Sequence, residues 1–366
     1  MDLHTEAERQ LAELISMPTI TADVVANDMA VKYCEAYLRE RGMHCTLHHY
    51  DGRLSLTAST RPDNDKTPTV LLNAHIDIAP ADEAMFRLHA DAEKLYGRGV
   101  FDMKFSIAGY LELVNTLYKE GTLADYDFGV MITSDEETGG FGAGHLAQAG
   151  YQPKIVIMPD SAASGWNIEK VAKGFWRFNL IAEGREGHGA RPWEGESASF
   201  KLIQILHDIK QLFNEHGPDT DTLNIGVIQG GKAYNLIPSH MMASLEIRVL
   251  SVKAQEDLLR RILAMCKQYG VKYEEFVFMK PVVANLDYPL TAQYMDVVEH
   301  VTGHRPESVI SAAGSDAPHF AEVGVECIVS CPAGGGHHTA NEWIDRKQFA
   351  QFVPVLREFL ERTARR

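Results

Sequence analysis

Short apolar segments alternate with helical patterns through the first part of the chain, and this alternation limits the folds open to it. Residues 69–78 (TVLLNAHIDI), 127–134 (DFGVMITS) and 154–159 (KIVIMP) have the length and composition of buried strands. Helical spacing of apolar residues fills stretches between them, as in 104–121. Wholly apolar strands are buried on both faces. We therefore predict an α/β fold with a mostly parallel sheet and helices on both faces.

The pattern changes near Lys173. The next hundred residues read as strand, helix, two strands, helix and strand, an order typical of a small ferredoxin-like α+β layer. After about residue 282 the first pattern returns, and 366 residues are more than one core usually serves. We predict one domain from residues 1–172 and 283–366, with residues 173–282 inserted as a second domain.

Charge and cysteine usage narrow the class of protein. With 35 Lys+Arg against 50 Asp+Glu, the formal net charge is −15, which disfavours a nucleic acid partner. No apolar stretch is long enough to span a bilayer, and residues 1–17 lack the features of a signal peptide. Five scattered cysteines without a CxxC pair are typical of reduced thiols. We expect a cytoplasmic protein with no membrane or nucleic acid partner.

Residues of metal-ligand type follow the predicted strands. Ligands of open α/β sheets bind beyond the carboxyl ends of the strands, so side chains at these ends can meet. The candidates at strand ends and in one glycine-rich loop are His75, Asp77, Asp102, Glu136, Glu137, Asp160, His337 and His338.

Imidazole and carboxylate groups are the ligands that zinc takes. Two ions about 3.5–4 Å apart need a shared carboxylate. His75 and Asp77 are two apart on an extended segment and face the same way, so Asp77 could accept the ring N–H of His75. In "TSDEETGG" a cation beside Glu137 would offset the repulsion between neighbouring acids, and burial would leave Glu136 able to take a proton from a metal-bound water.

Each of these signals has an ordinary alternative. Three acids after a strand are typical of a solvated loop or a helix N-cap. A His-x-Asp pair arises by chance, Asp102 could simply form a turn, and "GGGHH" could be a flexible loop. Five sites of ligand type in one set, without a Ser-His-Asp or reactive-cysteine alternative, favour a metal centre.

The motifs also resemble a known family. The segments "NAHIDIAP", "YGRGVFDMK", "TSDEETGG", "MPD", "EGREGHGARP", "NLIPSHMMASLEIRV", "GSDAPHF" and "GGHHTANEW" occur in family order across essentially the whole chain. The sequence is similar to metallopeptidase family M20, the aminoacylase, acetylornithine deacetylase and succinyl-diaminopimelate desuccinylase group of co-catalytic zinc amidohydrolases.

This resemblance implies two Zn²⁺ ions per subunit, with Co²⁺ or Mn²⁺ as substitutes. One ion would be held by His75, Asp102 and Asp160, and the other by Asp102, Glu137 and His338. Glu136 would be the general base, and Asp77 would orient His75. His338 fits the family pattern better than His337 because it directly precedes "TANE".

The resemblance further makes residues 1–172 and 283–366 the catalytic metal-binding domain and residues 173–282 a lid and dimerisation domain. In the implied homodimer, His188 would reach the partner subunit's active site and stabilise an oxyanion. Residues implied to contact substrate are Asn235, Arg248, Gly314 and Ser315, the last two in a "GSD" loop with Asp316. Without the resemblance, these positions indicate only an exposed hairpin, a strand end and a turn.

The implied activity is cleavage of the amide bond of an N-acyl amino acid. The alternative is a metallo-dipeptidase or aminopeptidase acting on small peptides. Asp160 stands where the deacetylase and desuccinylase branches usually carry Glu, and this favours the aminoacylase and peptidase side. A non-catalytic binding protein is a third reading, against which the intact Glu136 and the complete ligand set argue.

Overall fold

The computed structural model of this chain describes residues 3–62, 65–161, 165–213, 217, 219–311 and 314–366. Two compact units are present. The first comprises Met1–Lys170, Ala284–Val309 and Ser315–Arg366, and the second comprises Val171–Val283 and Ile310–Gly314. The sequence-based boundaries left Ile310–Gly314 in the larger domain. This segment groups with the second unit, where the N–H of Lys173 donates to the carbonyl of Ser311.

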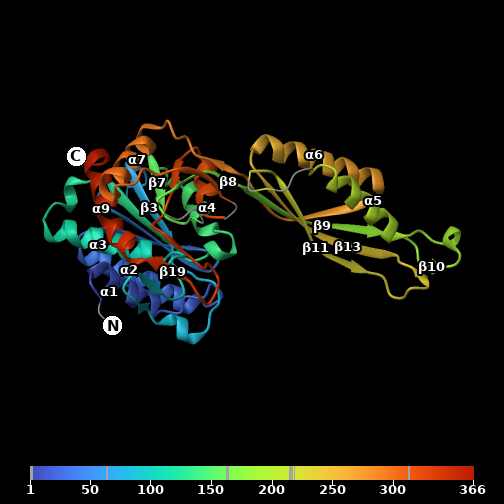
Figure 1. Cartoon of the computed structure of the whole chain (residues 1–366), viewed down its shortest axis with the longest axis horizontal. Coiled ribbons are helices and arrows are strands. Elements are labelled where there is room, and N and C mark those ends of the chain that lie inside the picture. Colours follow the sequence, from blue (N-terminus) through green and yellow to red (C-terminus); the bar gives the residue numbers. More distant parts are fainter. Residues whose placement is uncertain (1–2, 63–64, 162–164, 214–216, 218, 312–313) are drawn as a thin grey trace. The chain divides into compact units, whose positions relative to one another are not determined.

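A six-stranded sheet forms the centre of the first unit (Figure 1). In spatial order its strands are β1 (His44–Tyr50), β2 (Arg53–Ser59), β6 (Phe128–Thr133), β3 (Val70–His75), β7 (Ile155–Met158) and β17 (Glu326–Val329). The last four run parallel, while β1 and β2 add an antiparallel edge. Every residue of β3, β6 and β7 is buried, as their apolar composition predicts.

Two groups of helices cover this sheet. One group is joined by mutual contacts and packs against β1, β2 and β3; it consists of α1 (Glu6–Ile15), α2 (Val24–Glu40), α3 (Lys104–Lys119), α7 (Pro289–Thr302) and α9 (Arg346–Thr363). The second group, α4 (Phe141–Gln148) and α8 (Ala317–Glu322), contacts β1, β2 and β17. The prediction of a mostly parallel sheet between helices is confirmed. Among the described residues, no helix combines the length and apolar composition needed to cross a membrane.

A second, smaller sheet in the first unit has no counterpart in the sequence prediction. Its strands are β18 (Gly334–Gly335), β19 (Trp343–Asp345), β5 (Lys94–Tyr96) and β4 (His89–Ala90). Pairing of β19 with β5 brings the loop after residue 96 beside the loop that precedes residue 343. These loops carry Asp102 and His338.

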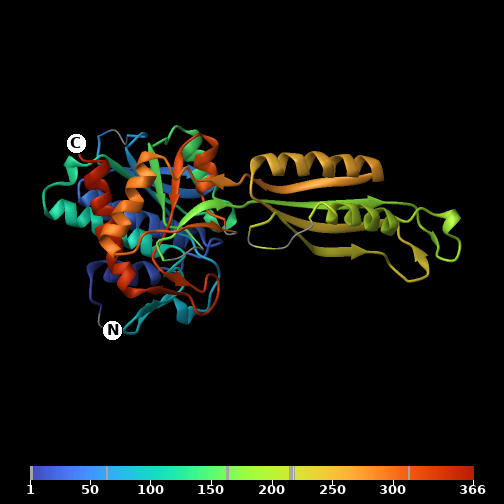
Figure 2. The ribbon, with the colours of Figure 1, turned by 45° about the horizontal axis from the view of Figure 1, so that its top comes forward.

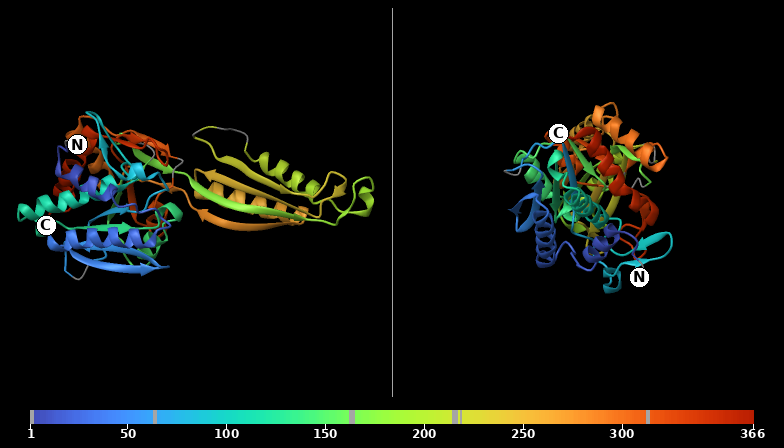
Figure 3. Two further views of the ribbon diagram at one scale, coloured as in Figure 1. Left: turned by 90° about the horizontal axis from the view of Figure 1, so that it is seen from below. Right: turned by 90° about the vertical axis from the view of Figure 1, so that its left-hand side faces the viewer.

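The second unit is the predicted ferredoxin-like layer. In chain order it contains β9 (Gly174–Glu183), α5 (Ala198–Lys210), β11 (Thr222–Gly230), β13 (His240–Val249), α6 (Val252–Tyr269) and β14 (Val271–Met279). The strands form an antiparallel sheet in the order β11-β13-β9-β14, and α5 and α6 contact both each other and the sheet (Figures 2 and 3). Alternate residues of β9 such as Trp176 and Phe178 form its core with Leu202 and Ile262 of the helices.

Shorter elements complete the fold. The strands are β8 (Ile168–Ala172), β10 (Gly187–His188), β12 (Leu236–Ile237), β15 (Val282–Val283) and β16 (Ser308–Ser311). The 3-10 turns are η1 (Glu83–Phe86), η2 (Leu123–Asp125), η3 (Glu136–Thr138) and η4 (Pro192–Glu194).

Candidate metal centre

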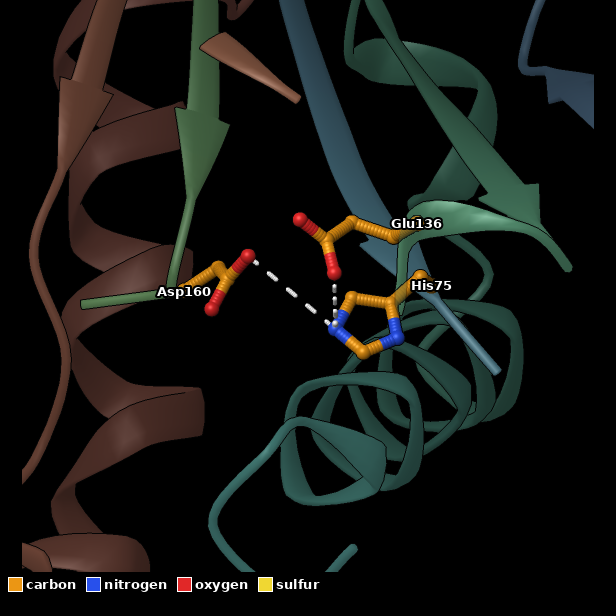
Figure 4. A group of neighbouring side chains, drawn as sticks. All are labelled: His75, Glu136 and Asp160. Atoms are coloured by element: carbon orange, nitrogen blue, oxygen red, sulfur yellow. Dashed lines mark ion pairs between the residues drawn. The ribbon is translucent and has the colours of Figure 1, made fainter. Parts of the chain in front are cut away.

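Parallel pairing brings three ligand-type side chains to one edge of the central sheet. His75 is the last residue of β3, Glu136 follows the end of β6 by three positions, and Asp160 follows the end of β7 by two. The His75 Nε2 atom lies 3.8 Å from Glu136 Oε2 and 4.0 Å from Asp160 Oδ2 (Figure 4). Ligand atoms of these three residues lie within 4.8 Å of one another, close enough to surround one ion.

A second group lies beside the first and contains Asp102, Glu137 and His338. The His338 Nε2 atom is 3.1 Å from Asp102 Oδ2 and 3.1 Å from Glu137 Oε2. The other oxygen of Asp102, Oδ1, is 3.1 Å from His75 Nε2. Asp102 therefore faces a histidine of each group with a different oxygen, as a carboxylate shared by two ions would. All five predicted ligands meet at this place.

Asp77 contacts His75 mainly through its main-chain carbonyl and the acidic turn through its carboxylate, a difference that the sequence did not predict. The His75 Nδ1 atom is 2.9 Å from the main-chain oxygen of Asp77 and 3.4 Å from its carboxylate. The carboxylate instead accepts hydrogen bonds from the Thr21 hydroxyl at 2.9 Å and from the N–H groups of Glu136 at 3.2 Å and Glu137 at 3.3 Å. The carbonyl thus orients the imidazole so that Nε2 faces the site, and the carboxylate holds the acidic turn.

The side chains of the three consecutive acids point to different partners because of the turn η3. Asp135 accepts a hydrogen bond from the N–H of Gly142 at 2.9 Å, at the start of α4. Glu137 accepts one from the N–H of Ala79 at 2.9 Å. Glu136 points toward His75 (Figure 4).

The family assignment agrees with this geometry. Residues 71–362, most of the chain, match the sequence family described as peptidase family M20/M25/M40. The chain belongs to this family. The predicted resemblance is confirmed, and with it the prediction of a metal-dependent enzyme that hydrolyses amide bonds.

Two named relatives are similar to this M20 chain along nearly its whole length. It is 25% identical over 359 residues to the succinyl-diaminopimelate desuccinylase of Legionella pneumophila (strain Paris), covering 92% of the chain and 93% of that protein. It is 28% identical over 370 residues to the acetylornithine deacetylase of Myxococcus xanthus, covering 94% and 92%.

Solved structures share the fold. The aminopeptidase PepT of Bacillus cereus has a TM-score of 0.81 at 20% identity and 97% coverage of both chains. The M20 family metallo-carboxypeptidase Sso-CP2 of Sulfolobus solfataricus has a TM-score of 0.76 at 17% identity, covering 98% of this chain and 99% of that one. The predicted fold class is thereby confirmed.

Burial governs the charges of the M20 site. It raises the pKa of Glu136 and that of Asp160 well above the usual carboxyl value; neighbouring carboxylates add to both shifts, and His75 opposes them. Burial also acts to raise the pKa of Asp102, but hydrogen bonds with His338 and His75 outweigh it, so this pKa is lowered. The surplus of buried carboxylates creates a demand for positive charge. Imidazole and carboxylate donors fit Zn²⁺ as the ion that meets it.

Protons should compete with metal for His338. Hydrogen bonds with Asp102 and Glu137 raise the pKa of His338 to about 10, from an ordinary value of about 6.5. An ion takes the neutral ring, so metal binding should release a proton at pH 8, and zinc affinity should rise with pH. Calorimetry in buffers of different ionisation enthalpy measures this release. His338→Asn should reduce this release and His145→Asn, at a half-buried position outside the site, should not; equal release from all three proteins would contradict the prediction.

The same shift affects the stability of the metal-free protein. Because the folded pKa of His338 is raised, its stabilising contribution is fully present below about pH 6.5 and is lost as the pH rises through about 10. Thermal unfolding of chelator-treated protein should therefore occur at a lower temperature at pH 10 than at pH 7, and His338→Asn should reduce this difference.

Gly140 allows the acidic turn to approach Asp316 closely. Its φ is +65°, and a Cβ atom there would lie 1.9 Å from Asp316 Oδ1. The other oxygen of Asp316 accepts a hydrogen bond from the Thr133 hydroxyl at 3.2 Å, and burial raises the pKa of Asp316 to about 8. Asp316 thus packs under the turn that carries Glu136 and Glu137.

Gly140→Ala should be strongly destabilising. Gly121→Ala is its matched control, since φ there is +72° and no atom lies within 4 Å of the added Cβ. The control should lower the free energy of unfolding by about 1–2 kcal/mol through backbone strain alone. Gly140→Ala adds the steric overlap with Asp316 and should cost roughly 2–5 kcal/mol. Equal costs in denaturant unfolding would show that the turn can move away from Asp316.

The predicted substrate residues lie at separate places. His188 of β10 pairs with Leu236 of β12, beside Asn235, whose carbonyl accepts from the N–H of Gly189 at 2.8 Å. His188 and Asn235 are thus neighbours at an exposed two-stranded sheet of the second unit.

Arg248 lies next to the last residue of β13. Its guanidinium carbon lies 4.7 Å from the ring centroid of Phe175, and its Nε is 2.9 Å from Glu246. Gly314 also approaches this ring, because an added Cβ would lie 3.6 Å from Phe175 Cε1. Ser315 belongs to the first unit, where its hydroxyl accepts from the N–H of Ala317 at 3.3 Å. The roles of these residues stay predictions.

Proposed function

We propose that this M20 hydrolase cleaves the amide bond of an N-acyl amino acid at a centre of two Zn²⁺ ions, for which Co²⁺ or Mn²⁺ can substitute. The observation that carries the proposal is the position of Asp102, whose two oxygens each lie 3.1 Å from a different histidine. One ion would be held by His75, Asp102 and Asp160, and the other by Asp102, Glu137 and His338. Bound there, the ions would polarise the substrate carbonyl and make water more acidic.

Glu136 is the proposed general base. Its Oε2 atom lies 3.8 Å from His75 Nε2, and its pKa, raised by burial, suits a group that both accepts and gives a proton. Glu136 takes a proton from water as the water oxygen attacks the amide carbon. It then gives this proton to the departing nitrogen as the carbon–nitrogen bond breaks, leaving a carboxylic acid and an amine.

His188 of the partner subunit is proposed to donate to the oxyanion that forms at the attacked carbon. The exposure of His188 on β10, beside Asn235, supports this role. Asn235 is proposed to bind the substrate carbonyl and Arg248 its carboxylate. Gly314 and Ser315 are proposed to line the pocket.

A second copy of this chain is the proposed partner. Among the described strands, β11 pairs on one side only, with β13, and it exposes Val227 and Ile228. Helix α5 exposes Phe200 and Ile203, at 68% and 60%. An unpaired strand and apolar helix residues of this kind suit a subunit interface.

Charges introduced on this surface should break the homodimer. Phe200→Glu combined with Ile228→Lys should yield a monomer by light scattering, because two buried charges would be desolvated. Leu263→Glu is the control, since Leu263 is an exposed apolar residue of α6. A wild-type monomer, or an unaffected dimer in the double variant, would contradict this interface.

The deacylase reading is supported by relatives named desuccinylase and deacetylase. Asp160, at the position where those branches usually carry Glu, favours the aminoacylase and peptidase side, so a metallo-dipeptidase or aminopeptidase is the alternative. The cytoplasmic location stays a prediction.

A substrate panel decides between the two activities. Metal-reconstituted protein is offered N-acetyl and N-succinyl amino acids, dipeptides and tripeptides, each with Zn²⁺, Co²⁺ or Mn²⁺, and amine release is followed. We expect turnover of acyl amino acids to exceed that of peptides with a free α-amino group. The reverse order would establish the peptidase alternative, and no hydrolysis by metal-loaded protein would overturn both.

A further inference from the structure

Glu342 is a buried carboxylate that accepts four hydrogen bonds from one short loop. Its Oε2 atom accepts from Arg98 Nη1 at 2.6 Å and from the N–H of Gly99 at 3.1 Å. Its Oε1 atom accepts from the N–H groups of Phe101 at 2.9 Å and Asp102 at 3.1 Å. The side chain is 1% exposed. One carboxylate therefore fixes the backbone from residue 98 to residue 102.

These bonds exclude Glu342 as a further metal ligand. A carboxylate offers about four lone-pair sites, and four donors already occupy the two oxygens. Arg98, itself buried, balances the charge of Glu342. The Arg98 Nη2 atom donates to the carbonyl of Pro80 at 3.3 Å. The group acts on the loop and not on an ion.

The smaller sheet explains how Glu342 reaches this loop. Glu342 directly precedes β19, which pairs with β5 through Trp343 and Tyr96. At the end of the pairing, the N–H of Gly97 lies 3.4 Å from the main-chain oxygen of Glu342. The side chain then extends over the residues that follow β5.

Glu342 also lies four positions after His338 in the sequence. A single short segment thus carries one candidate ligand and the group that holds the backbone of another, Asp102. The 3.1 Å separation between His338 Nε2 and Asp102 Oδ2 depends on how these two segments are held together.

We propose that Glu342 is a positioning residue that fixes Asp102 relative to His338 and so sets the geometry in which both ions are bound. The proposal rests on the two-metal function proposed above. A carboxylate is needed because its oxygens face only donors. A glutamine would direct its NH₂ group at two of them and leave buried N–H groups without acceptors.

Glu342→Gln tests this role through the metal. Zinc affinity is measured by competition with a chromophoric chelator, and the geometry of the centre by the visible absorption spectrum of the Co²⁺ protein. We expect affinity to fall by about 10–100-fold, as for other residues that orient metal ligands, and the Co²⁺ spectrum to change. Neither measurement requires a substrate.

Asp127→Asn is the matched control. Asp127 is also a buried carboxylate bonded to an arginine and to a backbone N–H, namely Arg61 at 2.6 Å and Thr69 at 3.2 Å. Asp127 directly precedes β6, whose first residue pairs with the first residue of β3. This is the end of the strands opposite to the proposed metal ligands. We expect Asp127→Asn to lower the thermal stability of the metal-free protein while leaving zinc affinity and the Co²⁺ spectrum unchanged.

If Glu342→Gln does not fold, Glu342→Asp keeps the charge and shortens the side chain by one methylene. It should show the same spectral change with a smaller loss of affinity. A Glu342 variant that loses stability like the control but keeps wild-type affinity and spectrum would overturn the proposal. Wild-type protein that binds no ions would instead refute the two-metal function itself, so the two failures are distinct.

Discussion

Glu136→Gln is expected to lower kcat by about 10²–10⁴-fold, the usual contribution of a general acid–base group. The glutamine side chain has nearly the same size but cannot accept the proton from water or pass it to the leaving nitrogen. Both ions should stay bound, because the five proposed ligands are unchanged. Steady-state kinetics and metal analysis of the same preparation check this pair of outcomes.

The geometry also offers a rival role for Glu136, since it forms a three-residue group with His75 and Asp160. The neighbouring variant Glu137→Gln is the matched control, because Glu137 is a proposed ligand 3.1 Å from His338. It should lose metal together with activity. If Glu136→Gln also loses an ion, Glu136 is a ligand and the base assignment is wrong.

Asp102→Asn should weaken metal binding and lower catalytic activity together. The amide keeps the shape of the side chain but replaces one oxygen, and its negative charge, with an NH₂ group. Because the two carboxylate oxygens face His75 and His338 separately, both ions should bind more weakly. Losing metal polarisation of the carbonyl is worth several kcal/mol, which corresponds to a fall in kcat/KM of about 10³-fold or more.

Metal content, zinc affinity and kcat/KM of Asp102→Asn should be measured beside Asp127→Asn, which removes a buried carboxylate at the far end of the strands. The control should keep both ions and most activity. An Asp102→Asn protein that retains two tightly bound ions would show that Asp102 is not shared between them.

Local pattern was sufficient to predict the central strands and the ligands that follow them. Buried parallel strands have a distinctive apolar composition, and their carboxyl ends necessarily lie at one edge of the sheet, so His75, Glu136 and Asp160 could be grouped before any coordinates. Asp102 and His338 were candidates from their loops as well, but the family motifs supplied the two ligand sets and the preference for His338 over His337.

Features that depend on long-range pairing were not predicted. The strand β1 (His44–Tyr50) is polar and only partly buried, so its residues give no strong strand signal. The strands of the smaller sheet are two or three residues long, and β5 and β19 lie far apart in the sequence. Hydrogen bonds between distant segments were missed as well, namely the bond from Thr21 to Asp77 and the four bonds to Glu342. An aspartate or glutamate in a sequence does not reveal which distant group it will bind.

The proposed ligands are also spread unevenly in the order of synthesis. The proposed ligands His75, Asp102, Glu137 and Asp160 all precede the second unit, whereas His338 follows it. Translation proceeds from the N-terminus at about 5–20 residues per second, so His338 emerges on the order of 10–40 s after Asp160. A growing polypeptide would therefore carry every proposed donor for one cation well before it could enclose the other, and hydrolytic competence would await the emergence of His338.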